Sequence, residues 1–549
     1  MPVITFEYDD LKEFGIDIEK EKLINIIPMM GSDIEDHNET EIKVEFFPNR
    51  PDNLSVPGVA RTLKGFIEQE TGLPEYPIEK SDEKVYVTRE VEEIRPYIAF
   101  AKIEGVSFDD NKIKQIMDFQ ENLHWVIGRD RKKVAIGVHN ADVVQAPYHY
   151  IATKPKENPF IPLEETREFT PQEILKEHDK GKDYAHLIEN FDKYPLIKDK
   201  DDKILSMPPI INGELTKLGN DTTNLIVDVT GTDEKAVRQS LNILCSSFAE
   251  AGGKIKSMEI IYEDKTITTP DLTPKTMNVS VKKANQLIGI NIDATEAKRL
   301  LEKARMGAEI IDEDTIKVQI PAYRIDILHE YDLVENIAIE YCIRNIPAEL
   351  PEMSTVAYEH NWFKSDKTIR ELMIGLGYQE IMSLMLTNEE SHYEKMNQEE
   401  TDHVEVARPI TIDGTMIRES LLNTLLEFLE NNKHQDLPQK IFEIGDILYT
   451  DDSETLKVRP GKKLAALSCH STANFTEAKS LINTVLDNLG YTYDIVNSDN
   501  SSFLAGRVAN VEGESENSKI KGVFGEISPK VISSFELEYP VVGFEIEFL

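Results

Sequence analysis

The sequence predicts a multidomain α+β protein, and three observations support this fold class. A chain of 549 residues is too long for one hydrophobic core and should divide into three to five domains. Strand-like runs such as "VITFEY", "KVAIGVH" and "NLIVDVTG" alternate with amphipathic helical stretches such as "SLLNTLLEFLENN". Proline-containing breaks separate these blocks.

The first two domains are predicted over residues 1–84 and 85–269. The first is a small domain, which runs from the opening strand through two helical stretches to "GLPEYPIEKSDEK", an acidic segment interpreted as a linker over residues 72–84. The second is a mixed α/β domain. In "TPQEILKEH", Thr170 should cap a helix, Pro171 suits its first position, and Glu173 completes a capping box.

Two further domains are predicted over residues 270–347 and 352–549. "TTPDLTP", over residues 268–274, interrupts secondary structure twice and marks the boundary before the third domain. "RNIPAELPEM" is interpreted as the linker after it. In the last 200 residues helices alternate with strands such as "IFEIGDILY" and "KLAALSCH", which suggests an antiparallel sheet flanked by helices.

The charge narrows the range of functions. Lys and Arg number 61 and Asp and Glu number 100, so the formal net charge is −39. This balance argues against wholesale wrapping around nucleic acid and against binding to an anionic membrane, so contact with RNA should be local or made through a partner. The sequence contains no spanning apolar run and starts without a signal-like segment, which predicts a cytoplasmic protein that does not enter a membrane.

The stretch "PAYRIDILHEYDLVENIAIEY" contains regularly spaced oxygen-bearing side chains. If a helix begins near His329, then Asp332, Glu335 and Asn336 share one face, and Asp326 could fold over its start as a fourth oxygen donor. Such a set suits a hard cation such as Mg²⁺. A solvated helix face, with acids near the positive end of the helix dipole, explains the same spacing.

The same stretch has an internal counterpart. "FPNRPDNLSVPGVARTL" and "IPAYRIDILHEYDLVENIA" share a proline, an Arg-x-Asp-x-Leu pattern and a following amphipathic helix. The two segments predict two small related helical domains. In each, the Arg-x-Asp pair (Arg50 with Asp52, Arg324 with Asp326) can be a buried ion pair that fixes the turn, which is the alternative to a metal-binding role for Asp326.

Six ordered segments together resemble the β subunit of phenylalanyl-tRNA synthetase in its archaeal and eukaryotic form. They are "FPNRPDNLSVPGVARTL", "GRDRKKVAIGVHN", "SMPPIINGELTKL", "LIVDVTGTD", "PAYRIDILHEYDLVENIAIEY" and "IFEIGDILY". The resemblance covers nearly the whole chain. It implies B1-like, B3/B4-like editing, B5-like and B6/B7-like catalytic-like domains over the four predicted ranges, in that order.

The resemblance also implies partners. They are an α subunit in an α2β2 heterotetramer, tRNA(Phe), and ATP and phenylalanine bound on the α subunit. A metal site is implied at Asp326, Asp332 and Glu335, and Asn336 stands where the family usually has an acid. A stand-alone scaffold or nucleic-acid adaptor built from the same domains, without hydrolysis, is the alternative.

The last domain is expected to resemble a class II synthetase domain without an active site. Class II synthetases hold ATP phosphates with arginines, one of them in a Gly-x-Gly-x-x-x-Arg arrangement, and residues 352–549 contain no such arrangement. "MIRES" offers Arg418 beside Glu419, which is interpreted as a surface or interface pair.

The editing interpretation concerns the second domain. A pocket for phenylalanine rejects tyrosine only weakly, so a second site that hydrolyses the tyrosyl ester is useful. The resemblance places this site at "SMPPIINGE" and "VDVTGTD". Asp228 and Thr230 alternate on a strand and should point to the same side to orient substrate or water, while Ser206 and Asn212 would add hydrogen bonds. Ordinary turn chemistry explains the same residue types.

The densest basic cluster lies in "GRDRKKVAIG". Its members are Arg129, Arg131, Lys132 and Lys133. Beside an editing pocket they could hold the acceptor end of tRNA through phosphate contacts. A solvated entry to the following strand is the alternative.

Overall fold

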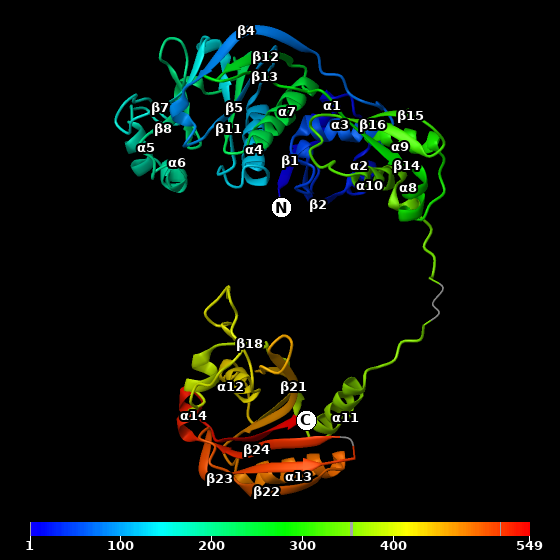
Figure 1. Cartoon of the computed structure of the whole chain (residues 1–549), viewed down its shortest axis with the longest axis vertical. Helices are drawn as coiled ribbons and strands as arrows, with labels where there is room; N and C mark the ends of the chain where they lie inside the picture. The colour runs from blue at the N-terminus through cyan, green and yellow to red at the C-terminus, as the bar shows by residue number, and fades with distance from the viewer. Residues whose placement is uncertain (1, 352–354, 517) are drawn as a thin grey trace. The chain divides into compact units, whose positions relative to one another are not determined.

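The computed structural model describes residues 2–351, 355–516 and 518–549 of the chain. It divides into two compact units, Met1–Leu350 and Pro351–Leu549 (Figure 1). The division falls within the predicted linker "RNIPAELPEM". Two of its residues lie outside the described residues: Glu352, which is also the predicted first residue of the last domain, and Met353. No helix among the described residues is both long enough and apolar enough to cross a bilayer.

The chain begins with a small antiparallel sheet of order β1-β3-β2. Its strands are β1 (Val3–Glu7), β2 (Ser32–His37) and β3 (Glu41–Phe46), and its helices are α1 (Tyr8–Glu13), α2 (Lys20–Ile26) and α3 (Val56–Phe66). The hydrophobic core of this part continues without a break into the neighbouring sheet, because α3 packs against α7 (Glu234–Glu250). The small domain is therefore one layer of a larger core.

A ten-stranded sheet forms the centre of the first unit. Its main order is β10-β9-β8-β7-β4-β12-β5-β11-β6, and β13 pairs with β12. The strands are β4 (Ile78–Val87), β5 (Tyr97–Glu104), β6 (Val134–Asn140), β7 (Tyr148–Thr153), β8 (Tyr194–Lys198), β9 (Ile204–Met207), β10 (Ile211–Asn212), β11 (Asn224–Gly231), β12 (Lys254–Ile261) and β13 (Thr266–Thr269). Helices α4 (Asp110–Val126) and α7 lie beside β5 and β11 (Figure 1).

The predicted linker over residues 72–84 is wrong in its second half. Residues from Ile78 onward form β4, which pairs in parallel with β12 and β7. The segment reads as polar because its side chains are largely exposed as far as Asp82, while the backbone still completes the sheet.

The predicted capping box at α5 (Pro171–Glu177) is confirmed, since both the Thr170 and Glu173 side chains make their reciprocal bonds; α6 (Asp179–Tyr184) follows it.

A second small sheet, of order β14-β16-β15, precedes the end of the first unit. Its elements are β14 (Lys275–Ser280), α8 (Val281–Ile288), α9 (Ala294–Lys303), β15 (Gly307–Ile310), β16 (Thr315–Ile320) and α10 (Glu330–Tyr341). Both small sheets place their third strand in the middle, and in both an Arg-x-Asp turn leads toward a helix. The two parts therefore share a sheet order and an Arg-x-Asp turn, and the prediction that they are helical is incomplete because each contains a three-stranded sheet.

The second unit is built on a seven-stranded sheet of order β17-β20-β21-β25-β24-β23-β22. All its pairings are antiparallel except that of β17 with β20. The strands are β17 (Gln379–Glu380), β20 (Gln439–Thr450), β21 (Val458–Cys469), β22 (Thr492–Asn497), β23 (Phe503–Glu514), β24 (Lys519–Ile527) and β25 (Val541–Phe548); β18 (Leu386–Thr387) pairs with β19 (Met416–Ile417). The helices are α11 (Asn361–Gly375), α12 (Leu422–Asn431), α13 (Phe475–Leu489) and α14 (Pro529–Ser534).

The predicted surface pair at Arg418 is wrong. Arg418 is buried and bonds Glu443 on β20 at 2.8 Å instead of its neighbour Glu419. The sequence could not reveal this because Glu443 is 25 residues away, and only the sheet brings it beside the turn.

Candidate functional site

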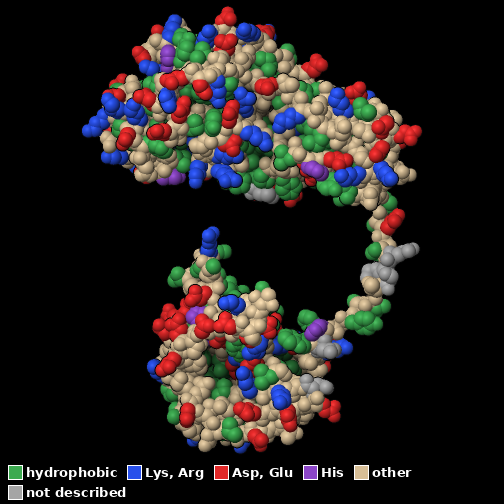
Figure 2. Space-filling model, viewed as in Figure 1, with side chains coloured by type: hydrophobic (Ala, Val, Ile, Leu, Met, Phe, Trp, Pro, Cys, Tyr) green, Lys and Arg blue, Asp and Glu red, His purple; other side chains and the backbone are tan. Residues whose placement is uncertain are grey.

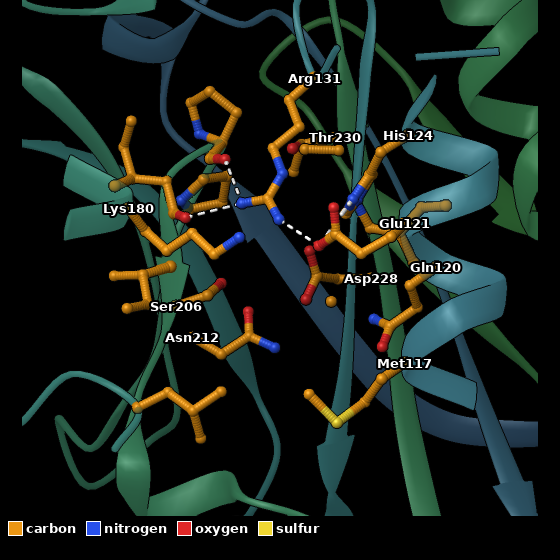
Figure 3. Close-up of a pocket in the computed structure, with 18 of the residues that line it drawn as sticks. Met117, Gln120, Glu121, His124, Arg131, Lys180, Ser206, Asn212, Asp228 and Thr230 are labelled. Atoms are coloured by element: carbon orange, nitrogen blue, oxygen red, sulfur yellow. Dashed lines mark hydrogen bonds and ion pairs between the residues drawn. The ribbon is translucent and has the colours of Figure 1, made fainter. Parts of the chain in front are cut away.

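The candidate site is a cavity of about 300 Å³ in the first unit, between α4, the strands β6 and β11, and the segment that joins β9 to β10. Ser206, Asn212, Asp228 and Thr230 all line it, as does Arg131. Three of these labelled side chains, Ser206, Asn212 and Asp228, face the same space in Figure 3. The structure thus brings together every residue predicted for substrate binding or editing chemistry.

Asp228 has one oxygen fixed and one free. It is 2% exposed, and its Oδ1 lies 2.7 Å from Nε2 of His139, a residue of the neighbouring strand β6. Among the described residues no hydrogen bond is made by Oδ2, and that atom is not shut away from the cavity. A fixed carboxylate with a free oxygen at the floor of a cavity can accept a hydrogen bond from substrate or water.

Thr230 lies two residues along β11 and points to the same side, as the alternation predicts. Its side chain is fully buried. Arg95 holds it, because its Nε donates to Thr230 Oγ1 at 2.9 Å and its Nη2 donates to the Thr230 carbonyl at 2.9 Å. Burial lowers the pKa of Arg95 to about 10. Thr230 therefore forms part of the cavity floor, and its hydroxyl is bonded to Arg95.

Ser206 and Asn212 face each other across the β9–β10 pair. Ser206 is 2% exposed, and its Oγ has no hydrogen-bond partner within the described part of the chain. A buried hydroxyl without a partner costs free energy unless a ligand or water completes it. This orphaned hydroxyl, beside the amide of Asn212, indicates a place for a polar group of a ligand.

The basic cluster is divided by the fold. Arg129, Asp130 and Arg131 adopt φ values of 47°, 55° and 61°, a left-handed run that is uncommon for side chains with a Cβ. This turn sends Arg131 into the protein, where it bonds the Ile210 carbonyl at 2.9 Å and the carboxylate of Glu121 (Figure 3). Arg131 therefore ties the Ile210 segment to α4 across the cavity wall. Because its guanidinium is already used in these bonds, the predicted contact of Arg131 with a phosphate is disfavoured.

The other three basic residues are placed differently. Arg129 and Lys132 are exposed, and Lys133 pairs with Asp233 at 3.1 Å. Figure 2 shows basic and acidic side chains mixed over the visible face of the first unit. A local contact with a nucleic acid through Arg129 and Lys132 stays a prediction.

Several cavity residues were missed by sequence reasoning. Glu121 and His124 from α4, Lys180 from α6, and the two supporting residues Arg95 and His139 come from segments far from the predicted ones. Burial alone would raise the pKa of Glu121, but the adjacent Arg131 and His124 outweigh it and lower this pKa to about 2. Of these residues, only His139 could have been suspected from the sequence, because a histidine at the end of the otherwise apolar run "VAIGVH" requires a polar partner when it is buried.

The predicted metal-binding acids do not converge. Asp326 accepts two hydrogen bonds from Arg324, at 2.9 and 2.7 Å, and Asn336 Oδ1 accepts a third from the same guanidinium at 2.8 Å. Asp332 Oδ2 caps α10 by accepting from the backbone of Leu328 and His329, both at 2.7 Å. The helix begins after His329 as predicted, but Glu335 is exposed while Asn336 is buried, so the two side chains lie in different surroundings.

The placement of these side chains does not suit Mg²⁺. Within the described ranges no three His, Cys, Asp or Glu side chains are grouped to hold a metal ion. The oxygen ligands are of the right chemical kind, but Arg324 already supplies the positive charge that the ion would bring. As placed, the residues do not fit the ion.

The internal counterpart explains this arrangement. Arg50 donates to both oxygens of Asp52 at 2.9 and 3.0 Å, just as Arg324 does to Asp326. Arg61, on α3, also bonds Asp52 at 3.2 Å and stacks on the ring of Tyr323, beside the second pair. The Arg-x-Asp pattern is thus a repeated buried ion pair, as the alternative interpretation predicts.

Comparison with known protein families assigns three parts of the chain. Residues 107–248 match the B3/4 domain, residues 277–341 match the tRNA synthetase B5 domain, and residues 346–548 match the phenylalanyl tRNA synthetase beta chain CLM domain. The candidate cavity lies within the first of these ranges, and the acidic stretch within the second.

Whole-length relatives agree with the domain matches. The chain is 50% identical to the phenylalanine–tRNA ligase beta subunit of Methanosphaera stadtmanae, covering 100% of this chain and 99% of the relative, and 43% identical to that of Methanocaldococcus jannaschii, covering both completely. It also resembles the crystal structure of an N-terminal fragment of the phenylalanyl-tRNA synthetase beta subunit from Pyrococcus horikoshii, with a TM-score of 0.60 and 37% identity over 62% of this chain and 99% of the fragment. The chain belongs to the phenylalanine–tRNA ligase β-subunit family and is part of an aminoacyl-tRNA ligase.

Proposed function

We propose that this β subunit edits misacylated tRNA: the cavity hydrolyses Tyr-tRNA(Phe), while its α subunit attaches phenylalanine to tRNA(Phe) with ATP. The observation that carries the proposal is the pairing of a carboxylate that has one free oxygen, Asp228, with an orphaned buried hydroxyl, Ser206, in one cavity. An aromatic amino acid that bears a hydroxyl supplies a partner for such a group, and phenylalanine does not.

The roles of the cavity residues follow from their free atoms. Ser206 and Asn212 hold the tyrosyl hydroxyl, and the free oxygen of Asp228 accepts a hydrogen bond from the attacking water. The water oxygen forms a bond to the ester carbonyl carbon, the bond from that carbon to the ribose oxygen breaks, and the ribose oxygen takes up the proton that the water loses. Thr230 shapes the floor beside Asp228 instead of meeting the substrate, because its hydroxyl is buried against Arg95.

Partners belong to the same proposal. The chain acts in the cytoplasm within an α2β2 heterotetramer, with ATP and phenylalanine on the α subunit, and the exposed Arg129 and Lys132 contact phosphates of the tRNA acceptor end. Lys133, paired with Asp233, contributes less. Mg²⁺ binding at Asp326, Asp332, Glu335 and Asn336 stays a prediction, and we assign the ion no part in the hydrolysis.

A deacylation assay tests this function. In the purified complex, Asp228→Ala should slow hydrolysis of Tyr-tRNA(Phe) about 100-fold, within the range typical of a lost acid–base group. Thr230→Ala should have a smaller effect. Charging with phenylalanine should stay unchanged in both variants.

The matched control is Asp221→Ala, because Asp221 is an exposed aspartate on the loop before β11. It should behave as the wild type. A wild-type complex that charges tRNA but does not release tyrosine from Tyr-tRNA(Phe) would favour the alternative of a non-hydrolytic scaffold and overturn the proposal.

A further inference from the structure

Asp228 sits against a buried chain of polar groups that does not touch the cavity. His139 is completely buried, with Nε2 at 2.7 Å from Asp228 Oδ1 and Nδ1 at 2.8 Å from Thr216 Oγ1. Thr216 Oγ1 also lies 3.3 Å from the Gly213 carbonyl and 3.4 Å from the Leu205 carbonyl. The order Thr216, His139, Asp228 leads from the backbone behind β9 to the cavity floor.

The proton on His139 is fixed by this chain of contacts. If Nε2 lacked a proton, it and the carboxylate oxygen would be two acceptors 2.7 Å apart, which is unfavourable in a buried place. With Asp228 ionised, the two remaining arrangements are a neutral ring that accepts from Thr216 at Nδ1, and a charged ring that donates from both nitrogens. In both of them Nε2–H donates to Asp228 Oδ1.

The backbone shows that this contact is built into the sheet. Gly137 lies directly opposite Asp228 in the β6–β11 register, two residues before His139. A Cβ at position 137 would overlap both Asp228 Oδ1 and His139 Nε2. The absence of a side chain at Gly137 is therefore what allows the imidazole and the carboxylate to meet.

We infer that His139 is a positioning residue for the proposed editing reaction: it holds Asp228 Oδ1, so that Oδ2 stays turned toward the substrate. The inference rests on the proposed function of the cavity. His139 itself meets no substrate, since it is buried behind the carboxylate. Its loss should lower the rate of the chemical step and leave the binding of tRNA unchanged.

Single-turnover hydrolysis of Tyr-tRNA(Phe) by the αβ complex, with enzyme in excess, tests the inference. We expect His139→Leu to lower the maximal rate by 10-fold to 100-fold, a range of about 1.4 to 2.7 kcal/mol, and to change the half-saturating enzyme concentration by less than about twofold. His139→Gln keeps an N–H near the position of Nε2, so it should recover most of the rate. A glutamine variant as slow as the leucine variant would overturn the inference.

A double-mutant cycle separates positioning from packing. If His139 acts through Asp228, then His139→Leu should change the rate by less than about twofold in the Asp228→Ala background. The same fold loss in both backgrounds would show that His139 acts independently of Asp228 and would overturn the inference. A leucine variant as fast as the wild type would do the same.

One readout does not depend on activity. In a spectrum of the ¹⁵N-histidine-labelled chain, the signal that disappears in His139→Leu identifies His139. We expect that signal to show a protonated Nε2. A bare Nε2 would overturn the inference even if the wild type hydrolyses Tyr-tRNA(Phe), whereas a wild type that lacks hydrolysis while showing a protonated Nε2 would overturn the proposed function alone.

Discussion

Asp228 and Asp326 are two aspartates with little-exposed side chains that the sequence presents as site residues, and the fold uses them in opposite ways. Asp228 shares one oxygen with His139 and keeps the other for the cavity. Asp326 gives both oxygens to Arg324. A carboxylate can serve a ligand only where the protein leaves an oxygen unused, so the partner within the protein decides the role.

The difference in partner has an energetic basis. A guanidinium matches both oxygens of a carboxylate in one plane, and this bidentate pair compensates two buried charges. An imidazole N–H reaches only one oxygen. The pair at Asp326 therefore stabilises a turn, whereas the pair at Asp228 orients a group that remains available for chemistry.

The largest effect is expected from breaking the ion pair. Asp326→Ala leaves Arg324, which is 4% exposed, with a buried charge, and among the described residues its remaining side-chain hydrogen bond is to Asn336. We expect the free energy of unfolding to fall by about 3 kcal/mol, measured by urea denaturation of the chain. Glu335→Ala, an exposed acid of α10, is the control and should change it by less than about 0.5 kcal/mol. Similar values for the two variants would contradict a structural role for Asp326.

Glu340, another buried acid near the same turn, should make the stability of the chain depend on pH. Burial raises the pKa of Glu340 from 4.5 to about 7, although Lys303 lies 3.9 Å away. Between pH 4.5 and 7 the folded chain therefore holds a proton that the unfolded chain has lost, so this group's contribution to stability falls as the pH rises.

Glu340→Gln should remove this decrease. Relative to the variant, the wild type should lose about 2 kcal/mol of unfolding free energy between pH 5 and pH 8. Glu335→Gln, on the exposed side of α10, should show the pH dependence of the wild type. Parallel curves for the wild type and Glu340→Gln would mean that Glu340 is ionised in the folded chain.

A smaller effect is expected at Arg131, and it distinguishes this buried, hydrogen-bonded residue from the exposed Lys132. Arg131→Ala removes the bonds to Ile210 and Glu121, so the cavity wall should loosen and hydrolysis of Tyr-tRNA(Phe) should slow about tenfold. The salt dependence of tRNA binding should stay unchanged. Lys132→Ala should instead reduce the slope of log K against log salt by about 1, because one phosphate contact is lost. A lower slope in Arg131→Ala would restore that residue as a phosphate contact.

The smallest effect concerns magnesium. If the ion binds the acidic stretch, it competes with Arg324 for Asp326 and Asn336. Binding would then make Mg²⁺ raise the melting temperature of Arg324→Gln more than that of the wild type, because the variant leaves these oxygens without a competing cation. Adding Asp332→Ala to either background should remove the increase. An equal response in all four proteins would show that the acids hold no specific ion.

Several elements could be predicted from local sequence because their causes are local. The alternation of β11 places Asp228 and Thr230 on one side, the capping box starts α5, and the repeated Arg-x-Asp pattern marks two related folds. Each depends on residues within a few positions of one another. The second half of the predicted linker failed, because pairing of β4 with the distant β12 and β7 overrides its polar composition.

The sequence by itself determined the family, the multidomain α+β class and part of the cavity lining, because ordered segments and strand periodicity are properties of the chain. Only the tertiary structure decided what those residues can do. It buried Arg131 through a left-handed turn, placed His139 behind Asp228, and gave both oxygens of Asp326 to a guanidinium. Whether a carboxylate oxygen remains free depends on which donors the fold places within hydrogen-bonding distance, and for Asp228 that donor is 89 residues away along the chain.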